Sequence, residues 1–315
     1  MLLACVLALL AALVAAPAAP AATTDSDVWF LVRCDFSNRS PDDPIVHPTP
    51  EHAHSHDFFG NKTTYYGSTY DSMSEPGTPT TCSRPKDTAA YWFPTVSWNG
   101  KELTPNRVNF YYRAGDKDLT TVMPFPADLK VITSNVRWYC GTDDTTAGSK
   151  DPPKLCKGGM LGVRIVFPDC IAKGDLTDPN LTPVSSTSNY RAGEKIDPAT
   201  GQVIDPDTGQ VIDIVDDDPD SPDHRLHMAR SVLQSDGTRS CPDTHPILVP
   251  TLTLNATFTI TKQAGRVTLS SGDASTMHAD FWNTWDQTEL ERFANRVVPC
   301  KYVVHGDLLE GPEDQ

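Results

Sequence analysis

Short runs of β-branched and aromatic residues recur along the chain, and several of them alternate between apolar and polar positions. Such runs predict β-strands, and the Pro, Gly, Asn and Asp residues between them favour turns. The runs lie at residues 28–32, 108–112, 129–132, 162–167 and 252–260. This pattern predicts a mainly β fold, an antiparallel β-sandwich or jelly-roll-like single domain with long loops.

Only one segment has convincing helical periodicity. Residues 287–298 place four apolar side chains on one helical face, namely Leu290, Phe293, Ala294 and Val297. The 27 prolines argue against an all-α fold, because proline is costly inside helices and common in loops and edge strands. We therefore expect one C-terminal helix beside the sheets.

The two ends of the chain and one internal segment differ from the rest. Residues 1–22 are apolar and end in small residues, which predicts a signal peptide and a secreted, extracellular protein; a retained N-terminal anchor is the alternative. The β domain is expected at 27–302, with a C-terminal tail at 303–315. Within it, 182–221 is an acidic insertion loop that repeats an eight-residue unit, whose Gln-Val-Ile copies could form short hairpins.

Charge and composition exclude several kinds of partner. The formal net charge of -15 argues against nucleic acid, because such a partner requires clustered Lys and Arg. Nine aspartates lie between residues 197 and 223, which we interpret as solvation of the insertion loop rather than as a calcium site. After the leader, no run of apolar residues reaches the ~18 needed to span a membrane.

Seven cysteines follow the leader, and none of them forms a Cys-x-x-Cys motif. Disulfides are the default in an exported protein. Cys140 with Cys156 and Cys170 with Cys241 are candidate pairs, although sequence alone fixes neither. An odd number leaves one thiol free or bonded to another molecule.

The first of three histidine motifs is His54-Ser-His56, which Asp57 follows. Side chains two apart on an extended strand point to the same face. We therefore expect His54 and His56 to converge on one site while Asp57 points away. His52 lies one step outward, where solvent exposure is expected.

The other two motifs lie far along the chain. His224 and His227 are three residues apart, so they would be neighbours on a helical turn. His278 and Asp280 would share a strand face, where a hydrogen bond could orient one against the other. Three separated motifs in a chain with nine histidines suggest one composite site. The alternative is that each histidine is an ordinary core or surface residue.

The ordered motifs resemble those of a known family, the domain of unknown function 1996. They are His54-Ser-His56 with Gly60-Asn61, Thr81-Cys82, Ala90-Tyr91-Trp92, Phe167-Pro168-Asp169-Cys170, Asp223-His224-Arg225-Leu226-His227-Met228, Cys241-Pro242-Asp243-Thr244-His245-Pro246 and His278-Ala279-Asp280-Phe281. The resemblance covers roughly residues 29–285. The family is found in secreted proteins of fungi and actinobacteria, sometimes beside carbohydrate-binding WSC modules.

The resemblance implies which histidines belong to a common pattern. His54, His56, His224, His227, His278 and Asp280 are in it, whereas His47, His52 and His305 are not. His245 looks structural, beside an expected disulfide. The chain departs from the family after Cys170, where Ile171-Ala172-Lys173 replaces Trp-Asp-Gly and the acidic insertion follows. If that tract shapes a ligand cleft, the substrate range here differs.

The leading hypothesis is a carbohydrate-active enzyme, a hydrolase or lyase acting on extracellular or cell-wall polysaccharide. Asp280 would orient His278 as a general base, and Tyr91 or Tyr111 would act as an acid or stack on a sugar. Residues assigned to catalysis are His278, Asp280, His227, His224 and Tyr91, and those assigned to ligand binding are His54, His56, Asn61, Tyr111 and Trp282.

A variant of the same site is metal-centred, with zinc or copper held by His54, His56 and His227. The rival from another class is a non-catalytic glycan- or cell-wall-binding protein that uses exposed aromatic residues. In a third possibility the protein is purely structural. For Trp282, packing in the core is the alternative to a role in binding sugar.

Overall fold

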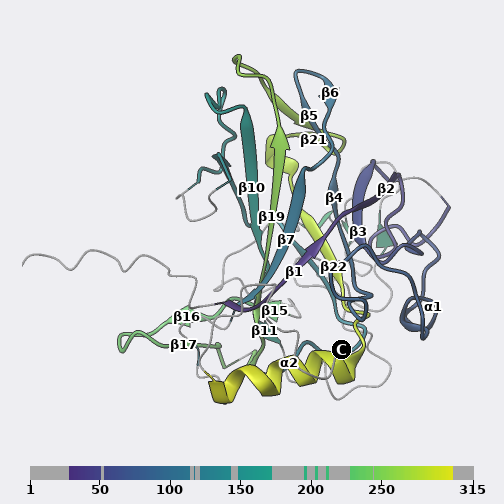
Figure 1. The fold of residues 1–315 in the computed structure, drawn as a ribbon, viewed down its shortest axis with the longest axis vertical. Coiled ribbons are helices and arrows are strands. Elements are labelled where there is room, and N and C mark those ends of the chain that lie inside the picture. Colours follow the sequence, from purple (N-terminus) through teal and green to yellow (C-terminus); the bar gives the residue numbers. More distant parts are fainter. Residues whose placement is uncertain are drawn as a thin grey trace, which may run out of the picture.

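The computed structural model of the chain describes residues 28–50, 53–113, 117, 121–142, 148–171, 195–196, 203–204, 211–212, 228–243 and 245–300. Within them, two five-stranded antiparallel sheets form the body of the molecule (Figure 1). The first consists, in spatial order, of β1 (Val28–Cys34), β7 (Arg107–Arg113), β19 (Thr251–Thr259), β10 (Met160–Val166) and β9 (Val136–Cys140). The second consists of β2 (Phe36–Ser40), β3 (His56–Gly60), β4 (Ala90–Pro94), β22 (Ala279–Trp282) and β8 (Lys130–Thr133).

Aromatic side chains fill the space between the two sheets. The ring of Tyr91 in β4 lies 3.8 Å from that of Phe110 in β7, centroid to centroid. Phe93 in β4 meets Phe258 in β19 at 6.3 Å. These residues belong to one continuous buried cluster. The arrangement confirms the predicted mainly β, antiparallel sandwich.

The second sheet is also covered on its outer face. Phe58 and Trp92 stack there at 5.4 Å, and Trp282 lies in the same small apolar cluster. Ile45, from the loop before β3, and Met73, from helix α1 (Tyr70–Ser74), cover this cluster. The central strands of this sheet are therefore buried on both faces.

Shorter elements surround the sandwich. They are the four-stranded sheet β21 (Gly272–Asp273), β20 (Val267–Leu269), β5 (Val96–Trp98) and β6 (Lys101–Glu102); the sheet β15 (Met228–Ala229), β11 (Cys170–Ile171) and β18 (Ile247–Leu248); the hairpin β16 (Val232–Leu233) and β17 (Arg239–Ser240); and the 3-10 turn η3 (Ala274–Thr276). Helix α2 (Gln287–Cys300) lies across one end of the sandwich, and its Phe293 packs on Phe30 of β1 at 5.2 Å (Figure 1).

The strands predicted from the sequence correspond to β1, β7, β8, β10 and β19, and the predicted helix is α2. The hairpins expected in the duplicated unit are present, because β13 (Val203–Ile204) pairs with both β12 (Lys195–Ile196) and β14 (Val211–Ile212). The short helix α1 was not predicted. The expected leader, the C-terminal tail and the rest of the insertion lie outside the described residues. No described helix is long and apolar enough to cross a membrane.

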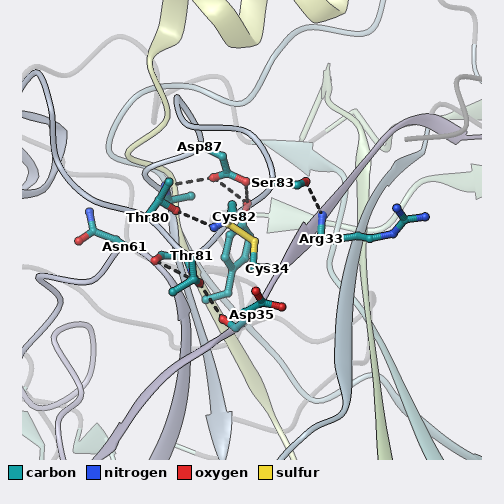
Figure 2. The surroundings of a disulfide bond; sticks show 12 residues. Arg33, Cys34, Asp35, Asn61, Thr80, Thr81, Cys82, Ser83 and Asp87 are labelled. Atoms are coloured by element: carbon teal, nitrogen blue, oxygen red, sulfur yellow. Dashed lines mark hydrogen bonds between the residues drawn. A yellow bond between two sulfur atoms is a disulfide. The ribbon is translucent and has the colours of Figure 1, made fainter. Parts of the chain in front are cut away.

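Three disulfides join distant parts of the chain. Cys140–Cys156 and Cys170–Cys241 confirm the two candidate pairs. Cys34–Cys82, which the sequence did not suggest, joins the end of β1 to the segment that leads to β4 (Figure 2). The side chain of Cys300, the remaining cysteine after the expected leader, lies outside the described residues.

Candidate metal centre

The register of the second sheet brings two of the histidine motifs together. His56, the first residue of β3, pairs with Pro94 of β4, and Asp280 of β22 pairs with Trp92. Because β22 and β4 are antiparallel, the residue two before Asp280 lies opposite the residue two after Trp92, so His278 is level with Pro94. His56 and His278 therefore flank β4 from its two sides, about 10 Å apart at the backbone. Their side chains can meet above Pro94.

Three imidazole rings converge at this point. The centroids of His54 and His56 are 4.2 Å apart, those of His54 and His278 are 5.2 Å apart, and those of His56 and His278 are 5.7 Å apart. One nitrogen of each ring lies within 4.8 Å of the other two. The predicted convergence of His54 and His56 on one site is thus confirmed. Asp57 instead meets Arg39 and Thr95.

Backbone carbonyls fix the tautomers of two of the rings. Nδ1 of His56 lies 2.9 Å from the Asp42 carbonyl, and Nδ1 of His278 lies 2.9 Å from that of Thr276. A carbonyl oxygen only accepts, so each ring donates from Nδ1 and keeps Nε2 unprotonated. Nε2 of His54 and of His56 is buried with no hydrogen-bond partner among the described residues. An Nδ1–H held in this way is the usual outer support of a metal-binding histidine.

The surroundings keep the three rings neutral. Burial lowers the pKa of His54 to about 3, with smaller contributions from the charges of His278 and His47. Burial also lowers the pKa of His56 well below its usual value, and it lowers that of His278. Neutral imidazole is the form that binds metal ions.

A buried carboxyl group lies beside the rings. One oxygen of Asp280 is 3.8 Å from Nε2 of His278, which is too long for a hydrogen bond. Neither oxygen has a hydrogen-bond partner among the described residues. Burial, and secondarily the charge of Asp43, raises the pKa of Asp280 well above its usual value. A cation at this point would offset the cost of an ionised, unpartnered carboxylate.

The profile of a known family covers most of this chain. The family described as domain of unknown function (DUF1996) matches residues 43–199 and 214–285. The chain belongs to the DUF1996 family. No curated protein and no solved structure gives a significant match. The matched ranges contain His54, His56, His278 and Asp280, so the converging residues are part of the DUF1996 domain itself.

Further groups beside the rings were not singled out in the sequence. His47 lies close enough for its charge to lower the pKa of both His54 and His56. Asp43 is buried, and its Oδ1 accepts the backbone N–H groups of Ile45 and Val46. Burial raises the pKa of Asp43 to about 6. The only local signal for this loop is its turn-forming sequence Pro-Asp-Asp-Pro at 41–44.

Two predicted ligand-binding residues, Asn61 and Trp282, make hydrogen bonds within the fold. The amide of Asn61 donates to the carbonyls of Met73 and Thr88, at 3.0 Å and 2.8 Å. Its oxygen accepts the N–H of Thr63, so Asn61 ties together the segments around it. Trp282 lies on the same face of the sheet as Asp280 but is buried, and its Nε1 donates to Asp128. The burial of Trp282 matches the packing alternative.

The two predicted tyrosines lie away from the three rings. Tyr91 points between the sheets, on the face of β4 opposite to that of Trp92, and its hydroxyl is 2.7 Å from that of Tyr112. Tyr111 lies in β7 of the first sheet, where Arg113 stacks on its ring. His224 and His227 lie outside the described residues, so their place in the DUF1996 site stays a prediction.

Cys34, Cys82 and Asp87 also have potential metal-binding atoms within 4.8 Å of one another. The two sulfurs are bonded to each other, however, which leaves no thiolate to bind a metal (Figure 2). The carboxyl of Asp87 accepts from the backbone N–H of Ala89 and from the hydroxyl of Tyr91. This group is therefore a structural element of the oxidised protein, and the histidine cluster is the better candidate for a metal centre.

Proposed function

We propose that this DUF1996 protein is a secreted metalloprotein that cleaves an extracellular or cell-wall polysaccharide with a zinc or copper ion. The ion would be held by His54, His56 and His278. The observation that carries this proposal is the convergence of three ring nitrogens within 4.8 Å of one another, while carbonyls hold the opposite nitrogens of two rings.

The donor set suits these two metals. Zinc and copper both accept imidazole readily, whereas magnesium and calcium prefer oxygen ligands. Nitrogens bound tetrahedrally at 2.0–2.1 Å from a zinc ion lie about 3.4 Å from one another. The observed limit of 4.8 Å is close enough that small ring rotations would complete the site.

Three protein ligands would leave one position of the ion for substrate or water. His56 and Asp280 are fully buried, but the side chain of His278 is 21% exposed, so the centre opens on the side of His278. Such an ion polarises a substrate oxygen or lowers the pKa of bound water to about 7. Asp280 is placed to receive a proton there or to complete the ligand set.

The substrate class rests on different grounds. The predicted leader indicates export, and three disulfides are typical of proteins from oxidising compartments. The resemblance to proteins that carry WSC modules favours polysaccharide over other extracellular polymers. His227, assigned to the metal in the sequence analysis, would be a further ligand.

Metal content tests the centre directly. We expect purified wild-type protein, loaded with zinc or copper and dialysed, to retain about one ion per chain by elemental analysis. His54→Ala/His56→Ala should retain none, because two of three ligands are gone. His305→Ala, outside the family pattern, is the control, and His227→Ala tests that residue separately. A wild type that holds neither metal contradicts the proposal.

Product release tests the reaction. The loaded protein should release soluble sugars from at least one polysaccharide in a panel of plant, fungal and bacterial cell-wall polymers. His278→Ala should reduce the rate about 1000-fold, since a metal Lewis acid contributes several kcal/mol to the transition state. Binding of a polysaccharide without any product, unchanged in His278→Ala, would support the non-catalytic alternative instead.

A further inference from the structure

A polar groove lies at the edge of the second sheet, separate from the three histidine rings. Its volume is about 680 Å³. It is lined by Asp35, Phe36, Ser37, Asn38, Lys62, Thr80 and Thr81. The strand β2, the end of β3 and the segment before Cys82 meet here. Figure 2 shows Asp35, Thr80 and Thr81 beside the Cys34–Cys82 disulfide.

The walls of the groove are held in place before any ligand arrives. The Thr81 hydroxyl donates to the Asp35 carbonyl at 2.7 Å (Figure 2). The same hydroxyl accepts the N–H of Gly60 at 2.9 Å. Backbone hydrogen bonds join Thr81 to the same two residues. With the adjacent disulfide, they make a preformed site, and preformed sites lose little free energy to ordering on binding.

The chemistry of the lining points to a class of ligand. The side chains of Ser37 and Asn38 have no hydrogen-bond partner among the described residues, so a hydroxyl and an amide are available. Lys62 is exposed and Asp35 carries the opposite charge, which leaves the lining close to neutral. Phe36 also lines the groove, but its ring packs against Phe59 on the core side of β2. Hydroxyl and amide groups in a groove whose two charges balance match a neutral sugar better than a polyanion.

We propose that this groove binds a neutral oligosaccharide. Asn38 pairs with Phe58, and Ser40 pairs with His56. Asn38 therefore lies on the same sheet face as His56, and it is two residues, or about 7 Å, along β2 from the residue that pairs with His56. The groove would be a binding subsite of the polysaccharide-cleaving enzyme proposed above, and its role in cleavage rests on that function.

Calorimetric titration with cellohexaose, laminarihexaose and chitohexaose tests the proposal, with an oligogalacturonate as the anionic comparison. The protein should come from a host without N-glycosylation, because Asn38-Arg39-Ser40 is an acceptor sequence. We expect at least one neutral oligosaccharide to bind. Ser37→Ala/Asn38→Ala should weaken that binding about tenfold, as expected for the loss of hydrogen bonds worth roughly 1.4 kcal/mol in all.

The chain provides a matched control at the opposite edge of the same sheet. Ser134→Ala/Asn135→Ala changes the same pair of residue types in the turn between β8 and β9 and should leave binding unchanged. Thermal unfolding of both double variants checks that they fold. Absence of binding by any neutral oligosaccharide, preference for oligogalacturonate, or equal loss in both double variants would overturn the proposal.

The groove and the metal centre can fail separately. His54→Ala/His56→Ala should lose metal but still bind the oligosaccharide. A wild type that holds metal and binds no oligosaccharide overturns the groove alone. A wild type that binds oligosaccharide and takes up no metal overturns the metal centre alone.

Discussion

At the scale of the residue, burial in the folded protein disfavours the ionised form of Asp43. Burial raises its pKa to about 6, from an ordinary value of 3.8. Between these values the unfolded chain releases the proton while the folded chain keeps it. Asp43 therefore supports the folded state below about pH 4, and this contribution is lost as the pH rises through about 6.

Asp43→Asn should remove this pH dependence. Asn keeps the oxygen that accepts the N–H groups of Ile45 and Val46 but cannot ionise. In metal-free protein, we expect stability near that of the wild type at pH 4 and a gain of about 1–3 kcal/mol at pH 7. Urea unfolding at both pH values measures it, with the exposed Asp151→Asn as control. A difference that does not change with pH would contradict the explanation.

Gly60, at the end of β3, allows a close approach that no other residue could make. Its φ is +78°, and an added Cβ would lie 2.1 Å from the carbonyl oxygen of Ala89. Gly100 has nearly the same φ, +77°, but open space around it. Gly100→Ala should cost about 1 kcal/mol from backbone strain, and Gly60→Ala about 3 kcal/mol from strain and overlap together. Equal losses in chemical denaturation would show that the contact with Ala89 does not matter.

The spacing of residues in the sequence predicted one part of the candidate site, the pair His54 and His56. The two-residue spacing in His54-Ser-His56 was enough to predict that both rings face one point, because strand geometry is local. Asp43 and His47 were missed, since only the fold brings their loop over the sheet. Tyr91 and Trp92 are adjacent in one strand, so their side chains point to opposite faces of the sheet. The sequence did not show which of the two faces carries the site, and Tyr91 was therefore assigned to it.

At the scale of the element, prediction succeeded where strands alternate or are long. β7 and β19 show such patterns, and both were predicted. β3 and β4 are buried throughout and lack alternation between apolar and polar residues, because the sandwich covers one face and the loop with α1 covers the other. Short apolar runs of this kind do not distinguish a buried strand from other buried structure.

The disulfides act on whole elements, and loop length predicts their relative effect. Cys34–Cys82 spans 48 residues, including β2, β3 and α1, whereas Cys140–Cys156 spans 16. Chain entropy predicts a loss of about 4 kcal/mol for Cys34→Ala/Cys82→Ala and about 3 kcal/mol for Cys140→Ala/Cys156→Ala. Denaturant unfolding of the two double variants gives the comparison. A larger loss in the second pair would show that native packing outweighs loop length.

The Cys34–Cys82 loop also contains both His54 and His56. Removal of this disulfide should therefore weaken metal retention at the proposed centre as well as stability, because the segment that carries His54 and His56 loses a covalent restraint in the folded protein. The Cys140–Cys156 variant should lose stability while its metal content stays unchanged.

At the scale of the whole molecule, sequence predicted the class of fold but not the order of its strands. In the second sheet β22 inserts between β4 and β8, far from its neighbours in sequence. This insertion sets His278 level with Pro94, opposite His56. The composite nature of the site could be suggested from three motifs, whereas the choice of partners depended on topology that long-range contacts determine.

The position of β22 has a consequence for synthesis. His278 is made 222 residues after His56. Until then β4 lacks a neighbour on that side, and only two of the three rings can meet. The third ring of the proposed metal centre is made last, so metal capture there would follow folding rather than guide it. The metal ion that the site acquires would then be one that is present in the compartment where the chain completes its folding.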